Sequence, residues 1–145
     1  MRAAALAMVA ALALAGCAAS PSGSSFIGTN LPAPSSQAVA VQVAAIVAHA
    51  LPPDHTTVLI EPVSDSRSAI MPALTTDLRK WGFGIGNIKS PAPSDQPVTF
   101  YITPSGSSAF LLRVIVAGSI YTRLYGVSDA GALLPMSALT VGVFS

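Results

Sequence analysis

AFLLRVIVAGSIYTRLYGV, residues 109–127, consists of two apolar arms joined by the short step Ala117-Gly118. Both arms are rich in β-branched and aromatic residues, which favour strands, and a two-residue step that contains glycine is typical of a hairpin turn. The stretch predicts two antiparallel strands, at 109–116 and 119–127.

Further short strands are predicted on both sides of this hairpin. They lie at 56–61, from Phe83 onward, at 98–102 and at about 138–143, and turns or loops at 90–97, 104–107 and 129–131 separate them. Pro135 interrupts the chain before the last strand, because a proline cannot donate a hydrogen bond to a neighbouring strand. The second half of the chain therefore predicts a mainly antiparallel sheet.

Two helices are predicted earlier, at about 37–50 and 68–81. Ser35 or Ser36 can cap the first helix, and Asp65, Ser66 or Ser68 can cap the second. Each helix has apolar residues at helical spacing: Val39, Val43, Ile46, Val47 and Ala50 in the first, and Ile70, Leu74, Leu78 and Trp81 in the second. Trp81 is predicted to be a core residue, and Gly82 is a suitable helix terminator. One compact α+β domain over residues 37–145 follows, with helices early and antiparallel strands late.

The N-terminus has the layout of an export signal. Arg2 is followed by an apolar run from Ala3 to Ala15, shorter than the roughly 20 residues that a membrane-spanning helix needs. The run ends at Leu14-Ala15-Gly16-Cys17, which contains the single cysteine of the chain. This sequence resembles the lipobox of bacterial lipoproteins, against the alternative of a chance cysteine behind an ordinary signal. The resemblance implies cleavage after residue 16 and acylation of Cys17 (palmitate or a similar chain), and Ala18 favours the outer membrane.

Residues 17–36 are predicted to be the lipidated cysteine and a flexible tether, since 18–36 are rich in Ser, Pro, Gly and Ala. Two interpretations stay open for this segment. It is a plain spacer, or Phe26, Ile27 and Leu31 are anchor points for a partner that orders the tether on binding.

The charge balance argues against nucleic-acid binding. Loss of Arg2 with the signal leaves equal numbers of basic and acidic residues, and only 9% of the chain is charged. Nucleic-acid binding needs a basic stripe, which is absent from the sequence. A neutral, charge-poor surface suits a protein held at a membrane or in an assembly.

No catalytic, metal or cofactor site is predicted, apart from the covalent lipid on Cys17. His49 and His55 stand on either side of Pro52-Pro53 and are interpreted as solvated. The glycines at 82–86 follow a helix, whereas phosphate-binding loops precede one. Tyr101, Tyr121 and Tyr125 are either core or exposed. Arg113 and Arg123 face solvent or a partner if no acidic residue is paired with them.

The order of these features resembles the TrbH-type conjugal transfer lipoproteins. The resemblance is carried by the lipobox, the tether and the alanine-rich helix, and by these segments: 56–60, Ala73-Leu74 to Phe83, 97–102, 109–114 and 121–125. The segment 83–86 departs from the family by its glycines and predicts an irregular strand. The family has no catalytic residues to carry over.

The resemblance implies a lipid-anchored structural component of a type IV secretion apparatus, facing the periplasm from the outer membrane. Its expected partners are the bilayer, through Cys17, and other envelope components of the apparatus, with no small-molecule substrate. The alternative is a free-standing envelope lipoprotein that binds peptidoglycan, lipid or another envelope protein.

Overall fold

The predicted hairpin forms the centre of the sheet. The computed structural model, which describes residues 25–63 and 68–143, places β5 (Ala109–Val116) and β6 (Ser119–Val127) antiparallel, with Val116 opposite Ser119. Ala117 and Gly118 both have positive φ, at 52° and 73°. This conformation is that of a tight hairpin turn whose twist matches the twist of the strands. The prediction for 109–127 is confirmed at both ends of both strands.

The whole sheet is mixed, and its order is β3-β2-β4-β5-β6-β7. Its remaining members are β1 (Phe26–Ile27), β2 (Thr57–Ile60), β3 (Gly84–Ile85), β4 (Gln96–Pro104), β7 (Leu133–Pro135) and β8 (Thr140–Val143). The short strands β1 and β2 both run parallel to β4, whereas every pairing from β4 to β8 is antiparallel. β7 and β8 pair with different parts of β6.

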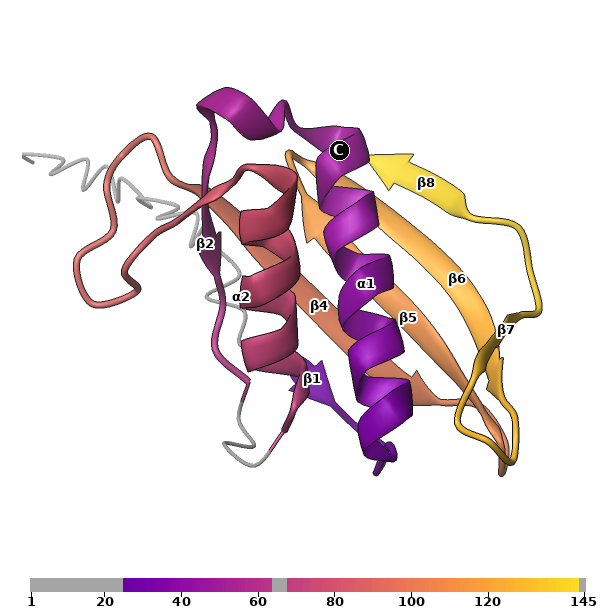
Figure 1. Ribbon diagram of the computed structural model, residues 1–145. Helices are drawn as coiled ribbons and strands as arrows, with labels where there is room; N and C mark the ends of the chain where they lie inside the picture. The colour runs from indigo at the N-terminus through magenta and orange to yellow at the C-terminus, as the bar shows by residue number, and fades with distance from the viewer. Residues whose placement is uncertain (1–24, 64–67, 144–145) are drawn as a thin grey trace, which may run out of the picture.

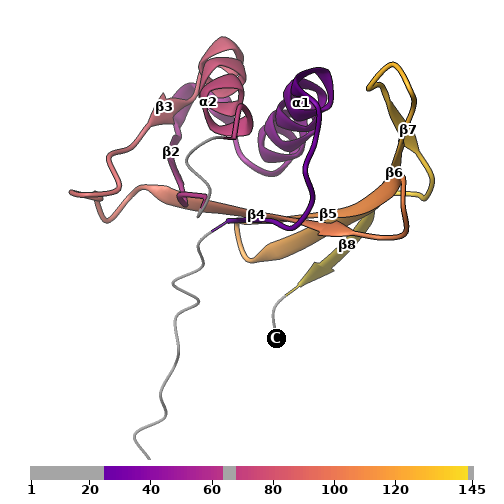
Figure 2. The same ribbon diagram turned by 90° about the horizontal axis from the view of Figure 1, so that it is seen from below.

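Two helices cover one face of this sheet. Figures 1 and 2 show α1 (Ala33–Ala50) and α2 (Ile70–Trp81) side by side on that face, with a short 3-10 helix, η1 (Pro53–His55), after α1. The buried helix residues include Val39, Val43, Val47, Ile70, Leu74 and Leu78, and they meet Phe100, Ile102, Phe110, Leu112 and Val114 of the sheet in one core. The predicted α+β fold in a single small domain is confirmed.

The start of α1 corrects the predicted boundary and cap. The helix begins at Ala33 instead of about residue 37, with Pro32 at the N-cap and Pro34 in the first turn, where a proline costs no hydrogen bond. Ser35 is therefore inside the helix. Its side chain is fully buried, and its hydroxyl donates a 2.8 Å hydrogen bond to the carbonyl of Gly131. Gly131 has φ +82° and packs against Pro34 and Ser35, so this turn suits glycine.

The second half of the predicted tether is folded. Ser25 is fully buried, and its hydroxyl accepts the backbone N–H of Phe100 at 3.1 Å. Ile27 and Leu31 are half-buried against the core of their own chain, so this part of the segment is ordered without a partner. Composition suggested a tether here, but the free edge of β4 supplies backbone partners for β1. The predicted signal, Cys17 and residues 18–24 lie outside the described residues.

Trp81 is 52% exposed, so its predicted core position is wrong. Gly82, with φ 102°, ends α2, and the N–H of Phe83 bonds to the carbonyl of Leu78 at 3.1 Å. Phe83 is 4% exposed and fills the core at this end of the helix. The helical spacing was correct, but the chain reverses at Gly82 and brings the next aromatic residue inward instead.

The last predicted strand, at about 138–143, is present as β8, and a short further strand, β7, precedes it. Pro135 ends β7, where a missing N–H is tolerated at the sheet edge. In the described ranges, no helix has the length and apolar character needed to cross a membrane.

Candidate functional site

The predicted lipidation motif, Leu14-Ala15-Gly16-Cys17, lies outside the described residues and stays a prediction. The described chain starts at Ser25, which is anchored in the sheet. Residues 18–24 therefore connect Cys17 to the folded domain.

The two histidines lie on separate elements. His49 is exposed in the last turn of α1, and its ring meets the ring of Tyr121 edge-on, with centroids 6.5 Å apart. His55 is exposed at the end of η1. Over residues 25–63 and 68–143, the structure brings together no three His, Cys, Asp or Glu side chains in a metal-binding arrangement.

Two of the three tyrosines are core residues, which the sequence had left open. Tyr125 is 1% exposed, stacks on Phe110 at a centroid distance of 5.7 Å, and donates a 3.0 Å hydrogen bond to Oε1 of Gln42. Burial raises the pKa of the Tyr125 hydroxyl, and the neighbouring Arg123 opposes that rise. Tyr121 is also buried, whereas Tyr101 is half-buried on the other face of the sheet.

The two arginines of the hairpin lie on opposite faces of the sheet. Arg123 is opposite Leu112, on the helix side, and Arg113 is opposite Thr122 and Tyr101 on the other side. The Arg123 guanidinium carbon lies 5.7 Å from the centre of the Tyr125 ring, and its Nε donates a 3.0 Å hydrogen bond to the carbonyl of Ser137. Arg123 thus has a structural role, and Arg113 is the arginine that faces outward.

Large apolar side chains are exposed along the last segment of the chain, on both faces of the sheet: Leu134 lies opposite Gly126, whereas Val141 lies opposite Tyr121 on the helix side. Of the large apolar residues that are exposed in the described structure, most belong to what we call the C-terminal apolar surface: Leu134 (54% exposed), Met136 (60%), Leu139 (39%), Val141 (59%) and Val143 (75%). No charged residue follows Asp129 in the sequence. Several exposed apolar side chains in an uncharged segment are typical of a protein or membrane contact.

Hydrogen bonds to β6 hold the chain that carries these exposed side chains. The N–H of Met136 bonds to the carbonyl of Leu124 at 2.8 Å, and the N–H of Leu124 donates to the hydroxyl of Ser137 at 2.9 Å. The hydroxyl of Thr140 donates to the carbonyl of Thr122 at 3.2 Å. The segment between β7 and β8 is therefore fixed to β6 along its length, and its apolar side chains are held in place outside the core.

Sequence reasoning did not single out the C-terminal apolar surface. The sequence predicted a last strand at about 138–143 and left the burial of its side chains open. The available signal was the lack of any charged residue after Asp129, which leaves an apolar strand without the charges that usually protect an edge.

The second uncovered region is the face of the sheet opposite the helices, which we call the open sheet face (Figure 2). Strand alternation places Tyr101, Leu111, Arg113, Ile115, Ile120, Thr122 and Leu124 there. The aliphatic members are half-buried against one another, and Arg113 is exposed. In the described part of the chain, no helix covers this face.

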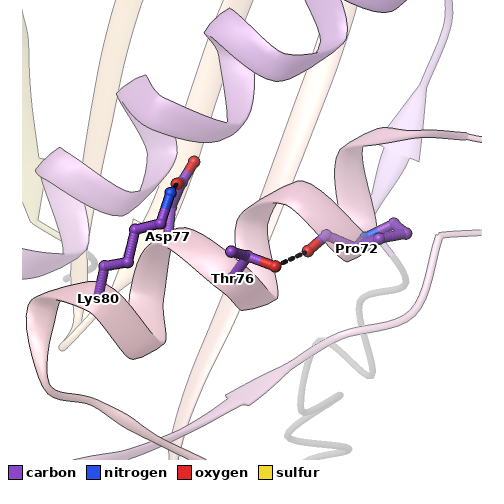
Figure 3. A network of polar contacts seen from close by, with 4 residues as sticks. All are labelled: Pro72, Thr76, Asp77 and Lys80. Atoms are coloured by element: carbon purple, nitrogen blue, oxygen red, sulfur yellow. Dashed lines mark hydrogen bonds and ion pairs between the residues drawn. The ribbon is translucent and has the colours of Figure 1, made fainter.

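A groove of about 590 Å³ lies between the exposed sides of α1 and α2. Its lining residues include Gln37 and Val41 of α1 and Ala73 and Asp77 of α2. Figure 3 shows the polar contacts on the α2 side: Thr76 donates to the carbonyl of Pro72 at 3.0 Å, and Lys80 Nζ lies 3.3 Å from Asp77 Oδ1. These four groups on the α2 side therefore bond to one another within the helix.

Comparison with known proteins identifies the chain. No curated protein and no solved structure matches it. The family profile of the conjugal transfer protein TrbH, however, matches residues 19–143, which include every described helix and strand. The chain therefore belongs to the TrbH family of conjugal transfer proteins.

Proposed function

We propose that this TrbH-family protein is a lipid-anchored structural component of a conjugative type IV secretion apparatus. In this proposal it supports mating-pair formation and plasmid transfer from the periplasmic side of the outer membrane. The observation that carries the proposal is the family match over 19–143, together with the motif Leu14-Ala15-Gly16-Cys17, which ends two residues before the match begins.

The folded domain starts close to the proposed anchor. Residues 18–24 can span at most about 25 Å when fully extended, at 3.3–3.6 Å per residue. Ser25 is already buried in the domain. An acylated Cys17 would therefore hold the domain near the bilayer surface, and several acyl chains on one residue give stable anchoring.

The surfaces of the domain support a role in binding over one in catalysis. The C-terminal apolar surface and the open sheet face are suited to contacts with other envelope components of the apparatus. Substitution of both His49 and His55 by alanine tests the alternative of an enzyme. We expect plasmid transfer to continue at the native frequency, and a loss of transfer with the protein still present at normal levels would point to catalysis.

Plasmid transfer from a donor that lacks this gene tests the main proposal. The deletion is complemented with the native gene, with Cys17→Ala, or with Ser22→Ala as a matched control outside the lipidation motif. We expect transfer to collapse in the deletion and to be restored by the native gene and the control, but not by Cys17→Ala.

Labelled palmitate and membrane fractionation provide the second readout. The native chain and Ser22→Ala should take up label and sediment with outer membranes, whereas Cys17→Ala should not take up label. Normal transfer from the deletion strain would contradict the apparatus role and favour a free-standing envelope lipoprotein. If Cys17→Ala takes up no label but still restores transfer, the proposed lipid anchor is contradicted, whereas the proposed role in the apparatus is not.

A further inference from the structure

β8 is a strand with one free side. It pairs with β6 through Thr140, Val141, Gly142 and Val143, which lie opposite Thr122, Tyr121, Ile120 and Ser119. In the described sheet, no strand pairs with its other side. All four residues of β8 are exposed. The backbone groups on the outer side of β8 are thus available to another strand.

The other outer strands are less suited to pairing. β3 has two residues, and β7 has three and ends at Pro135, which has no N–H to donate. Natural edge strands are commonly protected by prolines, lysines or other charges, or by being short. β8 and the residues beside it, 138–143, contain neither proline nor charge.

The side chains of β8 are exposed and leave room for a neighbouring strand. Val141 and Val143 are 59% and 75% exposed, and alternation places both on the helix side of the sheet, beyond the part that α1 covers. A Cβ added at Gly142 would meet no atom within 4 Å, so no other part of the described chain blocks the opposite face of the strand.

We propose that β8 pairs antiparallel with β8 of a second copy of this chain, across a two-fold axis at Gly142. In this register Val141 lies opposite Val143 of the second copy, and the reverse pair forms on the other side of the axis. The absence of charge in 138–143 means that the two identical strands meet without like-charge repulsion. An isologous pair of this kind joins the two sheets into one.

The size of the interface sets its expected strength. A stable interface buries about 1,600 Å² in total, and one pair of four-residue strands provides less. The association should therefore be weak and concentration-dependent in solution. It does not require the lipid anchor, although copies held at one membrane surface would meet at a higher effective concentration.

Sedimentation of the full mature chain in detergent, over increasing protein concentration, tests the proposal. We expect the native chain to change from monomer to dimer. Val141→Lys and Val143→Lys should remain monomeric, because each would place a charged lysine opposite a valine of the second copy at both ends of the strand pair. Val41→Lys is the matched control: Val41 is 51% exposed, but on α1, and its substitution should leave the dimer intact.

The same series overturns the proposal if the native chain stays monomeric at every concentration, or if the dimer persists in both lysine variants. Because the substituted side chains are exposed, the variants should fold, and circular dichroism verifies this. None of these outcomes depends on plasmid transfer or on acylation of Cys17, so failure here is distinguishable from failure of the proposed function.

Cysteine crosslinking tests the register. Residues directly opposite each other in an antiparallel pair have Cα atoms 4.5–5.5 Å apart, within the range of a disulfide, whereas diagonal residues are about 7–8 Å apart. Gly142→Cys should therefore form a disulfide-linked dimer on oxidation, and Val141→Cys should not. The unsubstituted chain controls for Cys17, its single cysteine. A Gly142→Cys adduct with a different protein would overturn the choice of a second copy.

Discussion

Val114 and Val143 lie on the same face of one sheet, yet Val114 is fully buried and Val143 is 75% exposed. Val114 belongs to β5, at the centre of the sheet, where the helix layer covers it (Figure 2). Val143 belongs to β8, beyond that layer. The two valines have the same strand preference and the same apolar surface, but one contributes to stability and the other is available to a partner. The helix layer, and not the residue type, separates the two roles.

The largest test of this comparison is truncation in the core. Phe100→Ala should lower the free energy of unfolding by about 3–5 kcal/mol, because it leaves a cavity among residues that cannot close over it. Val143→Ala should change it by no more than about 0.5 kcal/mol. Urea denaturation of the full mature chain measures both changes. Equal losses of unfolding free energy in the two variants would contradict the distinction between the covered centre of the sheet and β8.

A buried hydrogen bond connects the helix layer to the last segment of the chain. Ser35→Ala should cost about 1–3 kcal/mol of unfolding free energy, because the buried carbonyl of Gly131 would lose its donor, and this bond connects α1 to the turn before β7. Thr76→Ala is the control, since its hydroxyl bonds to Pro72 on an exposed turn of α2. A Ser35→Ala variant as stable as the control would show that this turn is not held by the helix.

Tyr125 predicts a pH dependence on the buried side of the sheet. Burial raises its pKa in the folded state, so the unfolded chain ionises first. The stabilisation is complete below the ordinary tyrosine pKa of about 10 and is lost as the pH rises through the higher folded value.

Tyr125→Phe should be about 1 kcal/mol less stable at neutral pH, because it lacks the bond to Gln42, and its stability should decline less steeply above pH 10. Denaturation at a series of pH values measures this. Tyr101→Phe, on the open sheet face, is the matched control, and the same change of slope in both variants would contradict the assignment to Tyr125.

The smallest effect is expected in the groove between the helices. Lys80→Ala removes the ion pair with Asp77, but the Lys80 side chain is 72% exposed, and solvent screens such pairs. The free energy of unfolding should change by less than about 0.5 kcal/mol, as it should for the neighbouring control Arg79→Ala. A loss of 1 kcal/mol or more in Lys80→Ala alone would show that this surface contributes to the fold.

The elements whose signal lies within a few consecutive residues were predicted correctly. The hairpin 109–127, the end of α2 at Gly82 and the positions of both helices follow from turn chemistry and helical spacing. The folding of residues 25–36 was missed because a two-residue strand such as β1 has no pattern of its own and exists through the free edge of β4. Trp81 was misplaced because its burial depends on the direction of the chain after the helix.

The candidate site divides in the same way. Membership of the TrbH family was already indicated by the order of short segments along the chain, and the family profile confirms it. The C-terminal apolar surface was not indicated, since its residues have the composition of an ordinary core strand.

The sequence by itself determined the hairpin 109–127, the two helices and the longer strands, because turn geometry and side-chain periodicity act over a few residues. The order of its short segments also indicated the family to which the chain belongs. Only the tertiary structure decided which apolar residues are covered. Coverage depends on where two helices lie on a sheet that is wider than they are, and pairings between segments far apart in sequence set that arrangement. Val141 and Val143 of β8 are exposed because β8 lies beyond the helices.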